Sequence, residues 1–402
     1  MFTPLVVRAR LRARSALLVV GLSLTIGAGC DRAASTDMTV TRKLPAFAID
    51  ERPTLVLEED GTPEKQFAGI SARRTPDGSI VVANRGTSEI HLFDRSGNVV
   101  RKLAQRGTGP GELRGGFQLT SRGDTVLVLG RPPDALGEVN TFSTQRGFIA
   151  RTRLAGDGTG SIVAARDRLS TGEFLVEKGP WFRAFSAPPQ RGILISDSVT
   201  FGVLQADSRV VWLPPVIRGW LFAFPTPGGP VPTSVAPYTL GSTTTAVVSD
   251  DRVWLIDAKD GRLLAFDRAG TRRVDQTLSV EPQKFDAAAL GRRRARELAA
   301  AARAFDSARI RSLYDEAPLP ETAPLVAGAS AGQSGEVWVR LFELDDDAPR
   351  QFVVIDREGA EVARATLPSR VEVQQIGPDF VLAVRRDSLG VESVVEYTLR
   401  RK

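Results

Sequence analysis

Short apolar runs separated by turns recur along the chain from about residue 53. Three copies are clear: an apolar run is followed by a second run that ends in an Asp-Arg-x-Gly turn, and a third run follows the turn. The turns lie at 93–97, 266–270 and 355–359. Ile80 and Asp94 are 14 residues apart, as are Val253 and Asp267. This shared spacing predicts one β-unit that is repeated along the chain.

The Asp-Arg-x-Gly segments have a mechanical explanation. An aspartate at the start of a tight turn accepts hydrogen bonds from the backbone that follows, and glycine adopts the positive φ that the turn needs. Such turns join neighbouring antiparallel strands. Each of the three segments is therefore expected to close a hairpin.

Weaker copies of the unit occupy 123–154, 172–186 and 378–399, which brings the number of units to six. Two segments interrupt the series. Residues 206–235 are rich in Pro and Gly, and residues 282–316 have a helical pattern.

The ends of the chain favour a closed fold. The last unit has only three apolar runs, and residues 52–60 hold one run without a unit of its own. If residues 53–59 pair with 392–399, a ring closes and no sheet edge is left open. We therefore expect an all-β, six-bladed β-propeller over 53–402, with a helical insertion at about 282–316. The alternative is two stacked β-sandwich domains.

The stretch QRGTGPGEL at 105–113 is rich in glycine, as phosphate-binding loops are. No Lys-Ser or Lys-Thr follows Gly111, and the residues after it predict another β-unit, whereas a dinucleotide loop needs a helix there. The stretch is therefore interpreted as a loop between blades.

The motif G-x-G-P-G-E-[FL] after F-D-x-x-G-x-x-[VL] resembles NHL-type repeats and related six-bladed propeller proteins of bacteria. The likeness is strongest over 67–113 and 319–367 and weakest over 160–235. Many proteins of this group are lipoproteins. The resemblance implies the fold more firmly than a function, because propellers serve as scaffolds, binding proteins and enzymes.

The first thirty residues are typical of an export signal. Four arginines precede an apolar run at 15–26, which is followed by Gly-Ala-Gly and Cys30, the only cysteine of the chain. This resembles a lipobox, in which the cysteine is acylated. We expect a signal peptide at 1–29, a tether at 30–52, and a protein held at the bacterial cell envelope by lipid on Cys30. A plain secretory signal is the alternative.

The charge of the chain is weak support for nucleic-acid binding. The sequence has 53 Lys+Arg against 47 Asp+Glu, a net charge of +6, and removal of 1–29 with its four arginines leaves 49 against 47, or +2. No nucleic-acid partner is expected. The partners expected are a membrane, through the lipid anchor, and an unidentified protein or small molecule, with the chain itself a monomer.

The helical segment at 285–317 combines a narrow apolar stripe with many arginines. Leu290, Leu298, Phe305 and Leu313 recur at seven- or eight-residue spacing. One interpretation is a basic helix that contacts anionic lipid or an acidic partner. The other is a solvated arginine-rich face above a stripe that docks on the propeller.

Candidate chemistry is sparse. His91 is the only histidine and is expected on a strand surface, away from the blade core, so no nitrogen-rich metal centre, and no cofactor, is predicted. The acidic run at 345–347 would bind Ca²⁺ only if further oxygen ligands converged on it. A solvated loop tip is the simpler interpretation.

The remaining candidates are polar or aromatic residues on inner strands and central loops, each of which also has an ordinary structural explanation. They are Asn84, Arg85, Trp181, Arg183, Arg218, Trp220, Tyr238 and Arg340. The function favoured is non-catalytic binding or scaffolding. The alternative is a propeller enzyme of the sugar-lactone hydrolase or lyase type.

Overall fold

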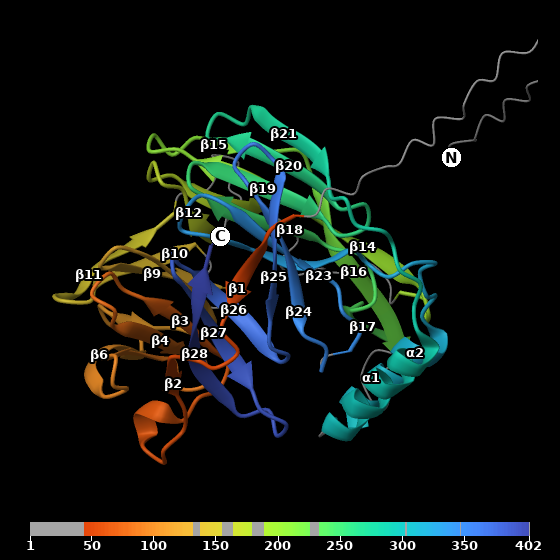
Figure 1. Cartoon of the computed structure of the whole chain (residues 1–402), viewed down its shortest axis with the longest axis horizontal. Helices are drawn as coiled ribbons and strands as arrows, with labels where there is room; N and C mark the ends of the chain where they lie inside the picture. Colours follow the sequence, from red (N-terminus) through yellow and green to blue (C-terminus); the bar gives the residue numbers. More distant parts are fainter. Residues whose placement is uncertain are drawn as a thin grey trace, which may run out of the picture. The chain divides into compact units, whose positions relative to one another are not determined.

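The repeated apolar runs form antiparallel sheets in which consecutive strands are neighbours (Figure 1). The computed structural model describes residues 44–131, 137–154, 164–178, 189–225, 233–301, 304–345 and 347–401. These belong to one compact unit, residues 44–402.

The strands of the first three sheets lie in chain order, apart from short edge strands. The first sheet contains β3 (Ile70–Arg74), β4 (Ile80–Asn84), β5 (Glu89–Phe93), β6 (Val99–Arg106) and β7 (Glu112–Leu113). The second contains β8 (Phe117–Arg122), β9 (Thr125–Gly130), β10 (Glu138–Ser143) and β11 (Gly147–Arg153). The third contains β12 (Ala164–Arg168), β13 (Phe174–Lys178), β14 (Leu194–Leu204), β15 (Val210–Trp212), β16 (Val216–Pro225) and β17 (Thr233–Pro237).

The remaining strands repeat the same order. One sheet contains β18 (Thr244–Ser249), β19 (Arg252–Asp257), β20 (Arg262–Asp267) and β21 (Arg272–Thr277). The next contains β22 (Val326–Ala331), β23 (Val337–Leu341), β24 (Arg350–Ile355) and β25 (Glu361–Leu367). The last contains β26 (Val371–Ile376), β27 (Phe380–Arg386), β28 (Glu392–Arg400) and β2 (Leu55–Leu57). A 3₁₀ turn, η1 (Pro63–Lys65), follows β2.

The first strands of these sheets lie side by side. β3 neighbours β8, β8 neighbours β12, β12 neighbours β18, β18 neighbours β22, β22 neighbours β26, and β26 returns to β3. Sheets that meet through their first strands in this way form a β-propeller, with the first strands around the centre.

The predicted hairpin turns are present. The Oδ1 atom of Asp94 accepts hydrogen bonds from the backbone N–H groups of Ser96 and Asn98, at 2.8 and 2.9 Å. Asp267 and Asp356 make the same pair of bonds in their own turns. Gly97 has φ +82°, the left-handed conformation that glycine adopts without strain. The side chain of the aspartate and the glycine therefore hold these turns as the sequence indicated.

The predicted pairing between the two ends of the chain is confirmed. Leu55, Val56 and Leu57 of β2 pair antiparallel with Glu396, Val395 and Val394 of β28.

An additional strand lies before it. β1 (Ala46–Ile49) runs parallel to β25 and antiparallel to β28, so it bridges two sheets. The folded part therefore begins earlier than residue 53, inside the segment that the sequence predicted as tether.

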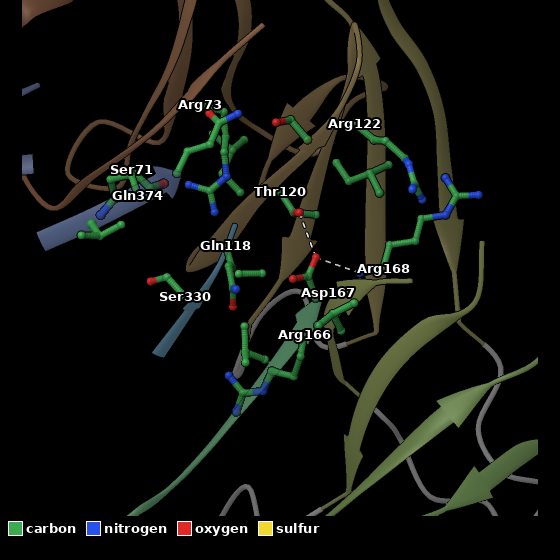
Figure 2. Close-up of a pocket in the computed structure, with 18 of the residues that line it drawn as sticks. Ser71, Arg73, Gln118, Thr120, Arg122, Arg166, Asp167, Arg168, Ser330 and Gln374 are labelled. Atoms are coloured by element: carbon green, nitrogen blue, oxygen red, sulfur yellow. Dashed lines mark hydrogen bonds between the residues drawn. The ribbon is translucent and has the colours of Figure 1, made fainter. Parts of the chain in front are cut away.

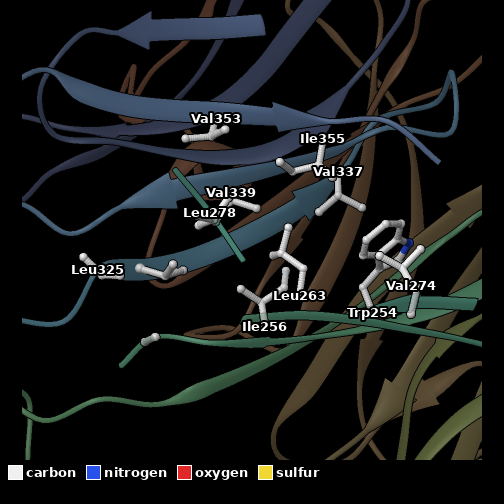
Figure 3. Close-up of a cluster of buried hydrophobic side chains, with 13 residues drawn as sticks. Trp254, Ile256, Leu263, Val274, Leu278, Leu325, Val337, Val339, Val353 and Ile355 are labelled. Atoms are coloured by element: carbon white, nitrogen blue, oxygen red, sulfur yellow. The ribbon is translucent and has the colours of Figure 1, made fainter. Parts of the chain in front are cut away.

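The apolar core lies between neighbouring sheets. Trp254, Ile256 and Leu263 of one sheet pack against Val337, Val339 and Ile355 of the next (Figure 3). Similar clusters join the other sheets of the described residues. Each sheet is thus covered on both faces.

This packing corrects the expectation for His91. Its side chain is 3 % exposed and lies edge-on to Phe93, with ring centroids 6.3 Å apart, and its buried Nε2 has no hydrogen-bond partner among the residues described. A polar residue that alternates with apolar ones faces solvent only when one face of the sheet is open. Here both faces are covered, so the alternation does not mark a surface position.

The segment at 206–235 also differs from the prediction. Rather than interrupting the fold, it supplies β15, β16 and the first residues of β17. Apolar residues such as Phe222 and Phe224 hold these strands in the core, despite the neighbouring prolines and glycines.

The helical insertion is confirmed as two helices, α1 (Ala287–Ala300) and α2 (Ala304–Glu316), and α2 lies beside β16 (Figure 1). Asp286 caps α1 by accepting from the N–H groups of Ala288 and Ala289. From the predicted stripe, Leu313 is buried and Leu290 half-buried against Phe222 and Phe224. The side chain of Phe305 lies outside the described residues.

The arginines of α1 explain the acidic run at 345–347. Arg296 pairs with Asp345 at 3.1 Å and with Asp347 at 3.2 Å, and Arg292 lies 3.7 Å from Asp345. Arg370 also pairs with Asp347 at 2.7 Å. Both carboxylates thus help to hold the loop after β23 against α1, while Asp347 remains exposed, as expected of a loop tip.

The glycine-rich stretch at 105–113 connects β6 to β8, as expected of a loop between blades. Glu112 accepts a hydrogen bond from the N–H of Gly109 at 2.8 Å, and Leu113 is buried. Arg151 of β11 donates to the carbonyls of Thr108, Gly109 and Glu112. The loop is therefore fastened to the sheet that follows it.

Candidate functional site

A central cavity of about 1450 Å³ lies among the first strands of the sheets. Residues of β3, β8, β12, β18, β22 and β26 all line it. Each of these strands is the first of its sheet and lies at the centre, beside the first strands of the neighbouring sheets, so each of them contributes side chains to the cavity wall. A cavity of this size is large enough for a metabolite-sized ligand.

Positive charge predominates on the described residues that line the cavity. Eight arginines do so: Arg73, Arg74, Arg85, Arg122, Arg131, Arg166, Arg168 and Arg218. Five carboxylates accompany them: Asp167, Glu177, Asp250, Glu372 and Asp379. Neither histidine nor cysteine is among these lining residues.

One group of arginines is neutralised by a buried carboxylate. Glu177 is fully buried, forms two hydrogen bonds with Arg166, and lies 3.5 Å from Arg218. Arg218 also binds Asp197, with N···O distances of 2.7 and 2.9 Å. This network joins β12, β13, β14 and β16, and its charges largely satisfy one another.

A second group surrounds Asp167, near the ends of β3, β8 and β12 (Figure 2). The Oδ1 atom of Asp167 accepts from the Thr120 hydroxyl at 2.9 Å and from the Arg168 N–H at 2.8 Å. Burial raises the pKa of the Asp167 carboxyl, while these hydrogen bonds and the charges of Arg73 and Arg122 act to lower it. No hydrogen-bond partner among the described residues reaches its Oδ2 atom.

Five of the lining arginines form no ion pair with a described carboxylate: Arg73, Arg85, Arg122, Arg131 and Arg168. Within the described ranges, Arg73 donates only to the carbonyl of Ala72, at 2.8 Å. Desolvation lowers the pKa of the Arg73 guanidinium, and the charge of Asp167 acts in the opposite direction. The cavity therefore holds cations whose charge the protein leaves partly uncompensated.

Two of the predicted ligand-binding residues line the cavity. Arg85 does so and donates from Nε to the carbonyl of Gly69 at 2.6 Å, and Arg218 belongs to the Glu177 network.

The other predicted residues lie elsewhere. Asn84 is buried and bridges the backbone of Gln66, Ala68 and Gly86. Arg340 donates to the carbonyl of Ala327 at 3.4 Å and is not a lining residue.

Tyr238 and Trp220 belong to the packing of the inserted helices. Tyr238 is 3 % exposed, and its hydroxyl donates to the carbonyl of Pro318 at 2.8 Å. Trp220 packs in the same apolar cluster as Leu313 of α2. Burial raises the pKa of Tyr238 to about 12. Trp181, Arg183 and Cys30 lie outside the described residues.

The sequence reasoning missed Arg73, Thr120 and Asp167. A signal for them was present, because Arg73-Arg74 and Arg166-Asp167-Arg168 place charges inside short strands directly before a hairpin turn. Charged side chains in a strand whose neighbours are buried need a polar space or a partner. The central cavity provides that space.

The described residues contain neither a metal-binding cluster nor a membrane-spanning helix. No group of three or more His, Cys, Asp or Glu side chains is placed to hold a metal ion. None of the described helices is both long and apolar enough to cross a membrane.

Comparison with known proteins gives likenesses among solved structures. No family model matches the sequence, and the search of curated proteins found no match. The chain is similar to a member of the DUF4221 family from Bacteroides vulgatus, with 8% identity, TM-score 0.46, and coverage of 90% of this chain and 100% of that one.

Two further similar structures are those of a lyase and of a calcium-binding protein. Virginiamycin B lyase from Staphylococcus aureus has 10% identity and TM-score 0.39, with 89% of this chain and 100% of that one covered. Regucalcin, a calcium-binding protein from Agrobacterium tumefaciens, has 13% identity and TM-score 0.37, with 89% and 96% covered. These likenesses assign neither an activity nor a ligand to this chain.

Proposed function

We propose that this chain is a six-bladed β-propeller of the NHL-like type that binds a ligand in its central cavity without transforming it. The single observation that carries the proposal is the cavity itself, about 1450 Å³ in volume and lined by the first strand of each sheet. Ligand pockets combine a preformed hollow with a few converging polar groups, and the arginines and Asp167 supply these groups.

The number of blades is part of the proposal. The first strands form a closed series of six neighbours, and the pairing of β2 with β28 supplies the last sheet with its fourth strand. A closed ring of this kind leaves few strand edges exposed.

We propose further that the protein is exported and held at the cell envelope by lipid on Cys30, as a monomer. The support is the basic and apolar start of the sequence and the position of its only cysteine. The ligand would be a small molecule or a segment of another protein that enters the cavity.

The second candidate function is an enzyme of the sugar-lactone hydrolase or lyase type. Asp167 is the observation that favours it: its carboxyl lines the cavity, burial raises its pKa, and its Oδ2 atom accepts no hydrogen bond from the described residues. Such a group would act as a general acid or base. No group of three or more metal-ligating side chains accompanies it among the described residues.

The test is a variant that fills the cavity. Ser330 lines it and would become a bulky obstruction in Ser330→Trp, whereas Ser96→Trp places the same bulk on an exposed turn. The purified full chain is screened by thermal unfolding against carboxylates, phosphate esters, neutral sugars and lactones. Probes that stabilise the wild type and Ser96→Trp are expected to lose their effect on Ser330→Trp.

Other outcomes would overturn the proposal. Stabilisation that persists in Ser330→Trp would place the ligand outside the cavity, and no stabilisation by any probe would oppose binding of such molecules there. Conversion of a bound lactone, followed by mass spectrometry and lost in Asp167→Asn, would establish the enzyme in place of the binding protein.

A further inference from the structure

We infer that the cavity binds a small hydroxylated anion, with its carboxylate or phosphate on Arg73 and a hydroxyl on Asp167. This inference rests on the proposed ligand-binding function of the cavity and adds the chemistry of the ligand. The proposed site lies where β3 neighbours β8 and β8 neighbours β12 (Figure 2).

Arg73 supplies the anion-binding group. A guanidinium carries five N–H donors, and Arg73 uses one of them on the carbonyl of Ala72. Its other donors have no partner among the described residues, and no carboxylate oxygen there lies within ion-pair distance. Arg73 is half-buried, and the charge of Asp167 offsets its own without direct pairing. A bound carboxylate or phosphate would add paired, charge-assisted N–H···O bonds.

The surrounding charge points the same way. Arg122 belongs to β8, beside β3, and uses its Nη1 on the carbonyl of Leu169 without pairing to a carboxylate. Eight arginines against five carboxylates give the lining an excess of three positive charges. Such a field raises the local concentration of anions.

Asp167 indicates that the ligand carries a hydroxyl group in addition to its anionic group. Its Oδ1 atom accepts from Thr120 and Arg168, while its Oδ2 atom has no partner in the part of the chain that the structure describes, so the carboxylate can accept a further hydrogen bond. A bare anion placed beside it would be repelled, whereas a hydroxyl group would donate to it. Gln118 accepts from Arg131 through Oε1, and its amide nitrogen has no partner among the described residues, so it can bind a second hydroxyl.

The experiment measures the affinity of the full chain by calorimetry with four probes: D-glucuronate, glucose 6-phosphate, glucose and acetate. Glucuronate or glucose 6-phosphate is expected to bind at least about tenfold more tightly than glucose and acetate, since each of the latter lacks one charged or hydroxyl contact. The order of the first two probes distinguishes a carboxylate site from a phosphate site.

Arg73→Gln is expected to lower the affinity for the anionic sugar by about ten- to a hundredfold and leave glucose unchanged. Arg101→Gln is the matched control, because Arg101 of β6 also donates to a backbone carbonyl, that of Gln145, but is exposed and does not line the cavity. Asp167→Asn keeps the shape and is expected to reduce the preference for hydroxylated over plain anions.

Failure of this inference can be told from failure of the proposed function. Equal binding of glucose and glucuronate, abolished by Ser330→Trp, would overturn the anion assignment and leave the cavity as the binding site. The anion assignment would also be overturned if Arg73→Gln, with a native circular dichroism spectrum, bound the anionic sugar as tightly as the wild type does. Binding of every probe that survives Ser330→Trp would overturn the proposed function itself.

Discussion

Leu57 gives a direct test of how the ends of the chain close the fold. It lies in β2, opposite Val394 of β28, and its side chain is 1 % exposed. It packs in a cluster that contains Phe93 of the first sheet and Leu382 of the last. Leu57→Ala therefore removes contacts that connect three distant parts of the sequence.

The expected magnitude follows from burial. Truncation of a buried leucine to alanine costs about 2–5 kcal/mol, from the lost transfer free energy and the cavity left behind. Val56 is the matched control, because it is the next residue of the same strand and is 40 % exposed. Val56→Ala is expected to change the free energy of unfolding by about 0.5 kcal/mol or less.

The assay is urea unfolding of the full chain, followed by the fluorescence of its five tryptophans. Leu57→Ala should lower the midpoint clearly, and Val56→Ala should leave it close to the wild-type value. Equal midpoints for the two variants would refute the reasoning, because they would mean that β2 does not pack against the sheets at both ends of the chain.

Two further predictions concern an ion pair and the lipid anchor. Hydrogen bonds from Arg191 and then Ser312 lower the pKa of Glu316 from 4.5 to about 2. Because the folded pKa is the lower one, the stabilisation is present above pH 4.5 and is lost as the pH falls towards 2. The melting temperature of Glu316→Gln should therefore lie below that of wild type at pH 6 and converge with it near pH 2. The exposed control Glu321→Gln should not show this pH-dependent difference from wild type. A difference between Glu316→Gln and wild type that stays constant from pH 6 to pH 2 would contradict the prediction. Cys30→Ser should move the protein from the detergent phase to the aqueous phase, and an unmodified Cys30 in a mature wild-type chain would exclude the anchor.

Local features were readable from the sequence because they depend on a few consecutive residues. The turns at Asp94, Asp267 and Asp356 need only an aspartate, a glycine and the backbone between them. The pairing of β2 with β28 followed from counting strands, since one run was missing at one end and one was unused at the other. The helical insertion was visible from its composition, although its partner, the loop that holds Asp345, was not.

The tertiary structure decided which polar residues face solvent, which face each other and which face the cavity. His91 and Arg73 are both polar residues within strands, yet His91 is buried between sheets and Arg73 lines the central cavity. Alternation along a strand distinguishes its two faces but does not say what covers each face. That depends on neighbouring sheets, whose residues are distant in sequence. Asp167 thus meets Thr120 across 47 residues of chain, and only the arrangement of the sheets brings them together.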